Sequence, residues 1–337
     1  NGQVQSESYL RNSKKSGKWT EYNRNGQLEE EKNYKDGKLN SRIVYTYYKN
    51  GQIKSKGNSE NQNVNYTGHM TYFYENGQIE SEGNFKFEKK DGNWKYFYEN
   101  GQLKENSNYY KNEYDGKLLS YYENGQVKTD ANFNPREKNL DKSDNKMSNY
   151  KDIMPSIAMQ GFLNEMDYDL YKEYGGIPNG KMITYYQDGK RFVEQNFDNG
   201  LLDGQFISFY ESGQIFKEVN YYQGEYDGRL VTYYENGKIS MDSYFKSRKD
   251  NNSNLYEKFL YDENDFIAKY GGRPHGKTIS YYENGQVKAD SDWKEGKLIG
   301  GIITYDENGQ RTEEKKQKQI YNTCQATEND FAEMVAE

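Results

Sequence analysis

The stretch Gly116-Lys-Leu-Leu-Ser-Tyr-Tyr-Glu-Asn-Gly-Gln-Val-Lys-Thr-Asp-Ala-Asn-Phe133 decides the fold of this chain of 337 residues. An apolar and aromatic run, Lys117–Tyr122, is stopped by Glu-Asn-Gly-Gln, and a second run, Val127–Phe133, follows. Asn-Gly between two such runs predicts a β-hairpin with a type I′ turn, which needs a positive φ at both central residues. We therefore expect two antiparallel strands joined by a two-residue turn.

The same turn signal returns along the chain at a nearly fixed step. Its glycine stands at Gly2, Gly26, Gly51, Gly77, Gly101, Gly125, Gly189, Gly213, Gly237, Gly285 and Gly309. The step from Gly125 to Gly189 is much longer than the others and contains an extra segment. The double step from Gly237 to Gly285 is interpreted as two periods with a degraded copy, Tyr261-Asp-Glu-Asn264. Because such repeats stack on their neighbours, the sequence predicts an all-β, elongated array of 24-residue antiparallel β-hairpins joined as a meander.

Two further regularities accompany the turns. A second glycine precedes most of them by nine residues, as Gly116 precedes Gly125, and an aromatic residue follows by eight. A longer echo relates Tyr174-Gly-Gly-Ile-Pro-Asn-Gly180 to Tyr270-Gly-Gly-Arg-Pro-His-Gly276. The two copies of the echo lie four periods apart, which supports the same repeating unit.

The pattern G-K-x-x-x-Y-Y-x-N-G-Q-[ILV]-K closely resembles the MORN repeat variant of bacterial proteins, as in the YwqK-type antitoxin family. The resemblance covers roughly residues 1–133 and 167–315. It implies a MORN-like hairpin meander and, from the family's name, a toxin as partner. Eukaryotic MORN relatives are scaffolds or modules close to lipid, which the resemblance also permits.

Composition excludes several classes of protein. The net charge is −7 and the mean hydropathy −1.28, yet 36 tyrosines and 15 phenylalanines are too many for a disordered chain. No run of 18 apolar residues indicates a transmembrane segment, and no basic block indicates nucleic acid as a partner. The single cysteine, Cys324, excludes an internal disulfide framework. The chain starts at Asn1 without a signal-like segment, so the compartment stays open between the cell envelope or secretion, which we favour, and the cytoplasm.

Domain organisation follows the interruption of the repeat. We expect hairpin arrays at 1–133 and 167–316, an interrupting segment at 134–166, and a tail or short capping helix at 317–337, where Thr327 could begin the helix. The segment at 134–166 is either an ordered elbow or a flexible linker.

The predicted register assigns a face to each side chain. Pairing across a two-residue turn places Leu118 opposite Ala131, Ser120 opposite Thr129, and Tyr122 opposite Val127, on the face of Phe133. We expect this face to pack. A longer turn would exchange the two faces, since a slip of one residue inverts every side chain.

The opposite face carries an aromatic ladder mixed with charge. Its members are Tyr22, Tyr47, Phe73, Phe97, Tyr121, Tyr185, Phe209, Tyr233, Tyr281 and Tyr305. One interpretation is that the rings cover their own sheet. The other is a partner surface, since tyrosine is enriched at interfaces and loses little entropy on binding. The candidate partner-binding residues are Tyr121, Tyr185, Phe209, Tyr233 and Tyr281.

Motifs for catalysis are weak, and we expect no catalytic, cofactor or metal site. The segment Gly271–Thr278 matches the phosphate-binding pattern GxxxxGK[ST], but it opens a predicted strand where that motif opens a helix. His69 and His275 have no partner at metal-ligand spacing. Glutamates such as Glu123 recur before each turn, and identical environments do not separate an acid from a base.

The sequence thus favours a non-enzymatic repeat protein that binds a protein partner along an extended aromatic surface, with an antitoxin or immunity role as the sharpest version. Adhesion or scaffolding at the cell surface is one alternative, and binding of a glycan or a lipid surface is another. The array ends expose strand edges, so end-to-end self-association is also open.

Overall fold

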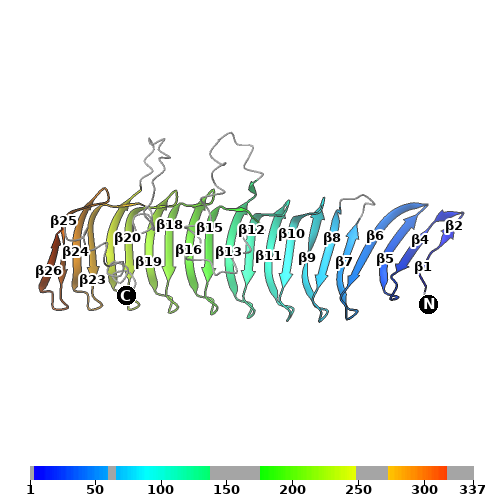
Figure 1. Ribbon diagram of the computed structural model, residues 1–337, viewed down its shortest axis with the longest axis horizontal. Helices are drawn as coiled ribbons and strands as arrows, with labels where there is room; N and C mark the ends of the chain where they lie inside the picture. The colour runs from blue at the N-terminus through cyan, green and yellow to red at the C-terminus, as the bar shows by residue number, and fades with distance from the viewer. Residues whose placement is uncertain (1–3, 60–65, 137–174, 248–271, 317–337) are drawn as a thin grey trace, which may run out of the picture. The chain divides into compact units, whose positions relative to one another are not determined.

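The computed structural model describes residues 4–59, 66–136, 175–247 and 272–316, and it confirms an all-β array of hairpins (Figure 1). These residues fall in two compact units. The N-unit comprises 4–59, 66–136 and 175–177, and the C-unit comprises 178–247 and 272–316. The predicted capping helix, most of the interrupting segment and the degraded copy lie outside the described residues.

The N-unit is an antiparallel meander in which each strand pairs with the next. Its strands are β1 (Ser6–Glu7), β4 (Gly17–Tyr22), β5 (Leu28–Lys35), β6 (Lys38–Tyr47), β7 (Ile53–Ser59), β8 (Gly68–Phe73), β9 (Ile79–Lys86), β10 (Lys89–Phe97), β11 (Leu103–Tyr110), β12 (Glu113–Tyr121) and β13 (Val127–Asn134). A short hairpin, β2 (Leu10–Arg11) with β3 (Lys14–Lys15), stands apart from this sheet.

The C-unit repeats the same meander. Its strands are β15 (Gly180–Tyr185), β16 (Arg191–Asp198), β17 (Leu201–Leu202), β18 (Gly204–Phe209), β19 (Ile215–Tyr222), β20 (Glu225–Tyr233), β21 (Ile239–Lys246), β22 (Arg273–Pro274), β23 (Gly276–Tyr281), β24 (Val287–Lys294), β25 (Lys297–Tyr305) and β26 (Arg311–Lys316). One further short strand, β14 (Ile177–Pro178), precedes them at the border of the units.

The Asn-Gly turn is a three-residue loop, so the predicted type I′ turn is wrong. Between β10 and β11, the Gly101 N–H donates to the Tyr98 carbonyl, and the Tyr98 N–H donates to the Gln102 carbonyl, both at 2.8 Å. Only the glycine has a positive φ, 85°. The Asn100 side chain accepts the Gln102 N–H at 2.9 Å, and such a local contact favours a type I turn before a left-handed glycine. Type I′ turns close the opposite edge, for example at Asn199-Gly200, where both φ values are positive.

The longer turn does not exchange the two faces, because a β-bulge follows it. Tyr121 faces Val127, so the predicted pairing of Tyr122 with Val127 is wrong. The register then shifts by one residue at Lys128, which restores the alternation. The deeper pairings are confirmed: Leu118 with Ala131 and Ser120 with Thr129.

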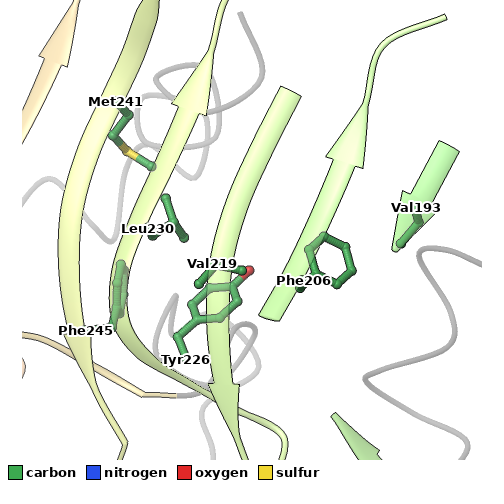
Figure 2. Packing of buried hydrophobic residues seen from close by; sticks show 7 residues of the cluster. All are labelled: Val193, Phe206, Val219, Tyr226, Leu230, Met241 and Phe245. Atoms are coloured by element: carbon green, nitrogen blue, oxygen red, sulfur yellow. The ribbon is translucent and has the colours of Figure 1, made fainter. Parts of the chain in front are cut away.

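The face predicted to pack is the buried one, and the chain covers it with its own bent strands. In the C-unit the cluster consists of Val193, Phe206, Val219, Tyr226, Leu230, Met241 and Phe245 (Figure 2). Gly228 has a φ of 104°, and the register shifts beside it, so β20 bends and lays Tyr226 over the cluster. Tyr114 does the same in the N-unit, with its ring centroid 4.9 Å from that of Tyr109 and 5.2 Å from that of Phe133. A very polar chain thereby gains a thin core.

The second copy of the sequence echo brings the backbone at Gly272 close to Tyr226 of this core. A Cβ on Gly272 would lie 2.4 Å from the Tyr226 carbonyl oxygen, so only glycine fits there. Pro274 follows it and is buried. Strand β21 pairs directly with β23, Met241 facing Ser280, across the double step before Gly285. The degraded copy assigned to this step lies outside the described residues and stays a prediction.

Candidate partner-binding face

The face opposite the buried cluster, here called the ladder face, carries one continuous row of side chains across the C-unit. Cross-strand pairing places in this row Ile183, Glu194, Ile207, Glu218, Val231, Asp242, Ile279, Asp290 and Ile303. β-Branched and acidic residues alternate in it, one per strand. We call it the acidic row. It was not predicted from the sequence, although each of its acids stands five residues past a turn glycine.

An aromatic row runs beside the acidic row, two residues further along alternate strands. It contains four of the predicted binding residues, Tyr185, Phe209, Tyr233 and Tyr281, whereas the fifth, Tyr121, belongs to the N-unit. Side chains two apart on a strand share a face, which brings the two rows together. The three C-unit tyrosines are half-buried. Phe209 is only 6% exposed, and its ring centroid lies 4.7 Å from the guanidinium carbon of Arg191.

Two of the four acids in the C-unit row are neutralised by cations on the same face. Lys181 Nζ lies 2.6 Å from Glu194, and Arg191 also pairs with this carboxylate. Burial opposes ionisation of Glu194, but the hydrogen bonds from both cations outweigh burial and lower its pKa. Arg229 holds Asp242 through two hydrogen bonds of 2.9 and 2.7 Å.

The other two acids have no such partner. Glu218 accepts a hydrogen bond of 3.1 Å from the Tyr233 hydroxyl, and Asp290 has no polar side-chain contact in the described ranges. Among the described residues, no cation forms an ion pair with either carboxylate. One cause is visible in the sequence, since Gln205 stands where Lys181 stands in the preceding repeat. The C-unit ladder face is therefore apolar in its centre and locally anionic.

The tyrosine three residues before seven of the turn glycines has a different role, which was not predicted from the sequence. Its hydroxyl donates to a backbone carbonyl of the next repeat, in seven bonds of 2.6 to 2.9 Å: Tyr48 to Phe73, Tyr74 to Phe97, Tyr98 to Tyr121, Tyr186 to Phe209, Tyr210 to Tyr233, Tyr234 to Tyr281, and Tyr282 to Tyr305. We call these bonds the tyrosine clips. The residue at the bulge packs on the clip ring, as Phe216 does on Tyr210 with centroids 5.1 Å apart.

One known repeat family matches this repeating unit. The MORN repeat variant matches residues 15–36, 43–61, 66–87, 90–112, 114–134, 178–199, 202–221, 226–247 and 274–295, which together make up more than half of the chain. The chain belongs to the MORN repeat variant family. MORN repeats are generally modules that bind proteins or membrane surfaces. The copies expected around Gly2 and Gly309 lie outside the matched segments.

Solved structures similar to this MORN protein are remote. One is the crystal structure of TcdB2-TccC3, 12% identical, with a TM-score of 0.22 over 97% of this chain and 18% of that one. Another is the pore form of the Photorhabdus luminescens Tc holotoxin with a TccC3 variant, 13% identical, with a TM-score of 0.21 over 92% of this chain and 16% of that one. This chain thus spans less than a fifth of their length. No curated protein matches it significantly.

Two titratable groups that are shielded from solvent lie on the packed face of this MORN protein, away from the ladder. Glu105 and Lys217 occupy the same repeat position, four residues past a turn glycine. Burial raises the pKa of Glu105, which accepts a hydrogen bond of 2.6 Å from Ser107. Burial lowers the pKa of Lys217 to about 8, and its Nζ donates to the Tyr226 hydroxyl at 2.6 Å.

The motifs that were considered and rejected as catalytic or ligand-binding sites occupy ordinary positions in the sheet. Lys277 and Thr278 lie within β23, so this glycine-lysine pair begins a strand and not a helix. His69 contacts Asn84 at 3.3 Å, and His275 lies 3.6 Å from Glu295. In the part of the chain that the structure describes, no three histidine, cysteine or acidic residues gather as a metal site would require. Within the same ranges, no helix has the length and apolar character of a membrane span.

Proposed function

We propose that this MORN protein is a non-catalytic binding module that engages a protein partner through the ladder face of its C-unit. The supporting observation is the unbroken row from Ile183 to Ile303, which lies beside half-buried tyrosines and carries two carboxylates that pair with no cation of the described residues. Tyrosine provides large, stiff contact area, and interfaces are enriched in it. An apolar centre with unpaired charge at fixed points suits a specific partner.

The charge of the face favours a protein over a membrane surface. The C-unit row places a carboxylate in every repeat from Glu194 to Asp290, and the whole chain carries a net charge of −7. Cytoplasmic leaflets and other anionic lipid surfaces attract basic segments and repel acidic ones. We therefore assign the family's protein-binding role to this chain.

In its sharpest form, the proposal is an antitoxin or immunity role, in which the ladder face covers a cognate toxin. Its support is the resemblance of the repeats to the YwqK-type antitoxin family. A partner that must be neutralised requires tight binding, and a row spanning several repeats offers the contiguous area that tight complexes bury.

A pair of matched triple variants tests the face. Tyr185, Tyr233 and Tyr281 are changed to alanine in the C-unit, and Tyr22, Phe97 and Tyr121 in the N-unit, and both proteins are used in pull-downs from the organism that encodes the chain. We expect one dominant protein, retained by the N-unit variant and weakened by at least about tenfold by the C-unit variant. Circular dichroism checks that both stay folded. Undiminished capture by a folded C-unit variant refutes this face, and binding to a glycan array without protein capture refutes the partner class.

A further inference from the structure

The acidic row has a spacing that selects the shape of its ligand. Neighbouring strands lie about 4.8 Å apart, so carboxylates on alternate strands recur at about 9.6 Å. Glu218 on β19 and Asp290 on β24 are separated by four strand steps, about 19 Å. These two carboxylates, which pair with no cation of the described residues, are thus two repeats apart in the same row of cross-strand partners.

Extended and helical ligands match this spacing to different degrees. A polyproline II segment advances about 9.3 Å for each turn of three residues, so six residues cover about 18.6 Å. Fourteen residues of an α-helix cover about 21 Å, about 2 Å too far. A β-strand returns a side chain to the same face at intervals of about 6.8 Å, so three intervals cover about 20 Å and reach both anchors, but no interval ends near the midpoint of the row at Asp242. Polyproline II alone brings a side chain both to the midpoint and to the end of the row from Glu218 to Asp290.

We propose that the C-unit ladder face binds a basic, proline-rich segment of the protein partner in the polyproline II conformation. Arginine or lysine at every third position lies over the acidic row and is anchored at Glu218 and Asp290. The intervening prolines pack against Tyr233 and Tyr281. This inference rests on the proposed function and names its partner class.

Several physical features support this occupant. Aromatic-lined surfaces recognise polyproline II segments, which are ordered before binding and lose little entropy. A cation over Glu218 meets a carboxylate whose hydrogen bond within the described residues comes from the Tyr233 hydroxyl, so it does not compete with an existing ion pair. A second copy of this chain is a poor occupant, because its own ladder face would bring a second acidic row against the first.

Synthetic peptides test the inference on the full chain. The probe is a capped peptide of repeated Pro-Pro-Arg triplets, and binding is measured by fluorescence anisotropy at low salt. Three peptides of the same length are compared with it: one of the same composition with irregular arginine spacing, one with glutamate for arginine, and an alanine-rich helical peptide of equal charge. We expect the regular peptide to bind at least about tenfold more tightly than the other three.

Matched variants locate the site. The double variant Glu218→Gln with Asp290→Asn removes both anchors and should weaken the regular peptide by about tenfold or more. The control Glu211→Gln with Glu283→Gln removes the same charge from exposed turn residues and should leave its affinity unchanged. An equal loss in both variants contradicts the site, because it shows a response to net charge alone.

The remaining outcomes separate this inference from the proposed function. Equal binding of the irregular peptide, or tighter binding of the helical one, overturns the polyproline II match. Failure of all peptides, together with a natural partner that is lost from the tyrosine variant of the C-unit, overturns the partner class and leaves the proposed function intact. A natural partner that is insensitive to the ladder face overturns both.

Discussion

The two units have the same repeat backbone but differ in the side chains of their ladder faces. Where the C-unit has an unbroken β-branched series, the N-unit has Thr20, Tyr45, Thr71, Lys95 and Leu119. Where the C-unit has four acids, the N-unit has Glu31, Lys56, Glu82, Asn106 and Asp130. The consensus positions of the repeat therefore specify the fold in both units, and the variable positions form a continuous row of alternating β-branched and acidic residues in the C-unit alone.

The packed faces of the units differ as well. The C-unit cluster around Phe206 and Val219 is apolar. In the first repeats of the N-unit, the packed face instead carries Glu30. This residue is buried, lies 2.5 Å from Lys32 and also pairs with Arg42. Burial opposes ionisation of Glu30, but hydrogen bonds from both cations lower its pKa. Replacing apolar burial by buried ion pairs gains little stability, so the first repeats of the N-unit should open before the C-unit does.

The largest expected difference between the units comes from truncating one ring in each. Phe206 and Trp19 occupy the same repeat position, but Phe206 is 1% exposed and Trp19 is half-buried. Phe206→Ala should lower the stability of the C-unit by about 3–5 kcal/mol, and Trp19→Ala should lower that of the N-unit by less than half as much. Hydrogen exchange resolved by unit measures both. Equal losses would contradict the difference between the packed faces.

The paired glycines of the echo sharpen the comparison. A Cβ at Gly272 meets the Tyr226 carbonyl oxygen at 2.4 Å, and its φ of 74° is unfavourable for alanine. A Cβ at Gly176 meets the Tyr114 carbonyl oxygen at 3.1 Å. Gly272→Ala should therefore cost about 2–5 kcal/mol and Gly176→Ala about 1 kcal/mol. Thermal melts of the two variants check the order, and a larger shift for Gly176→Ala would contradict the packing described here.

The units should also respond to pH with opposite signs. The raised pKa of Glu105 means that the folded N-unit keeps a proton that the unfolded chain loses above its ordinary value of 4.5, so stability falls as pH rises through that window. Lys217 loses its proton in the folded C-unit at about 8, while the unfolded chain keeps it up to 10.5, so stability rises across that range. Urea titrations followed at Trp94 and Trp293, one in each unit, measure both slopes. Glu105→Gln and Lys217→Met should flatten them, and slopes of equal sign would contradict the assignment.

The repeat and its hairpins could be predicted because Asn-Gly and the aromatic positions act locally. The turn type could not, since the side chain of Asn100 holds its own backbone at negative φ and the compensating bulge is visible only in the paired strands. Four ladder residues were placed correctly on one face. The acidic row was not predicted from the sequence, because its members, such as Glu218 and Asp290, are distant in sequence and are aligned only by strand pairing between repeats.

The smallest effect should be shared by both units, because the tyrosine clips are built in the same way in each. Tyr98→Phe in the N-unit and Tyr210→Phe in the C-unit each remove one hydroxyl bond of 2.7 Å to the next repeat and should cost about 1 kcal/mol. Tyr281→Phe is the matched control, since its hydroxyl makes no hydrogen bond in the described residues, and it should cost nothing measurable. Urea midpoints compare the three variants. A cost for Tyr281→Phe equal to that of the clips would show that its hydroxyl serves the fold, and it would return the ladder of the C-unit to a packing role.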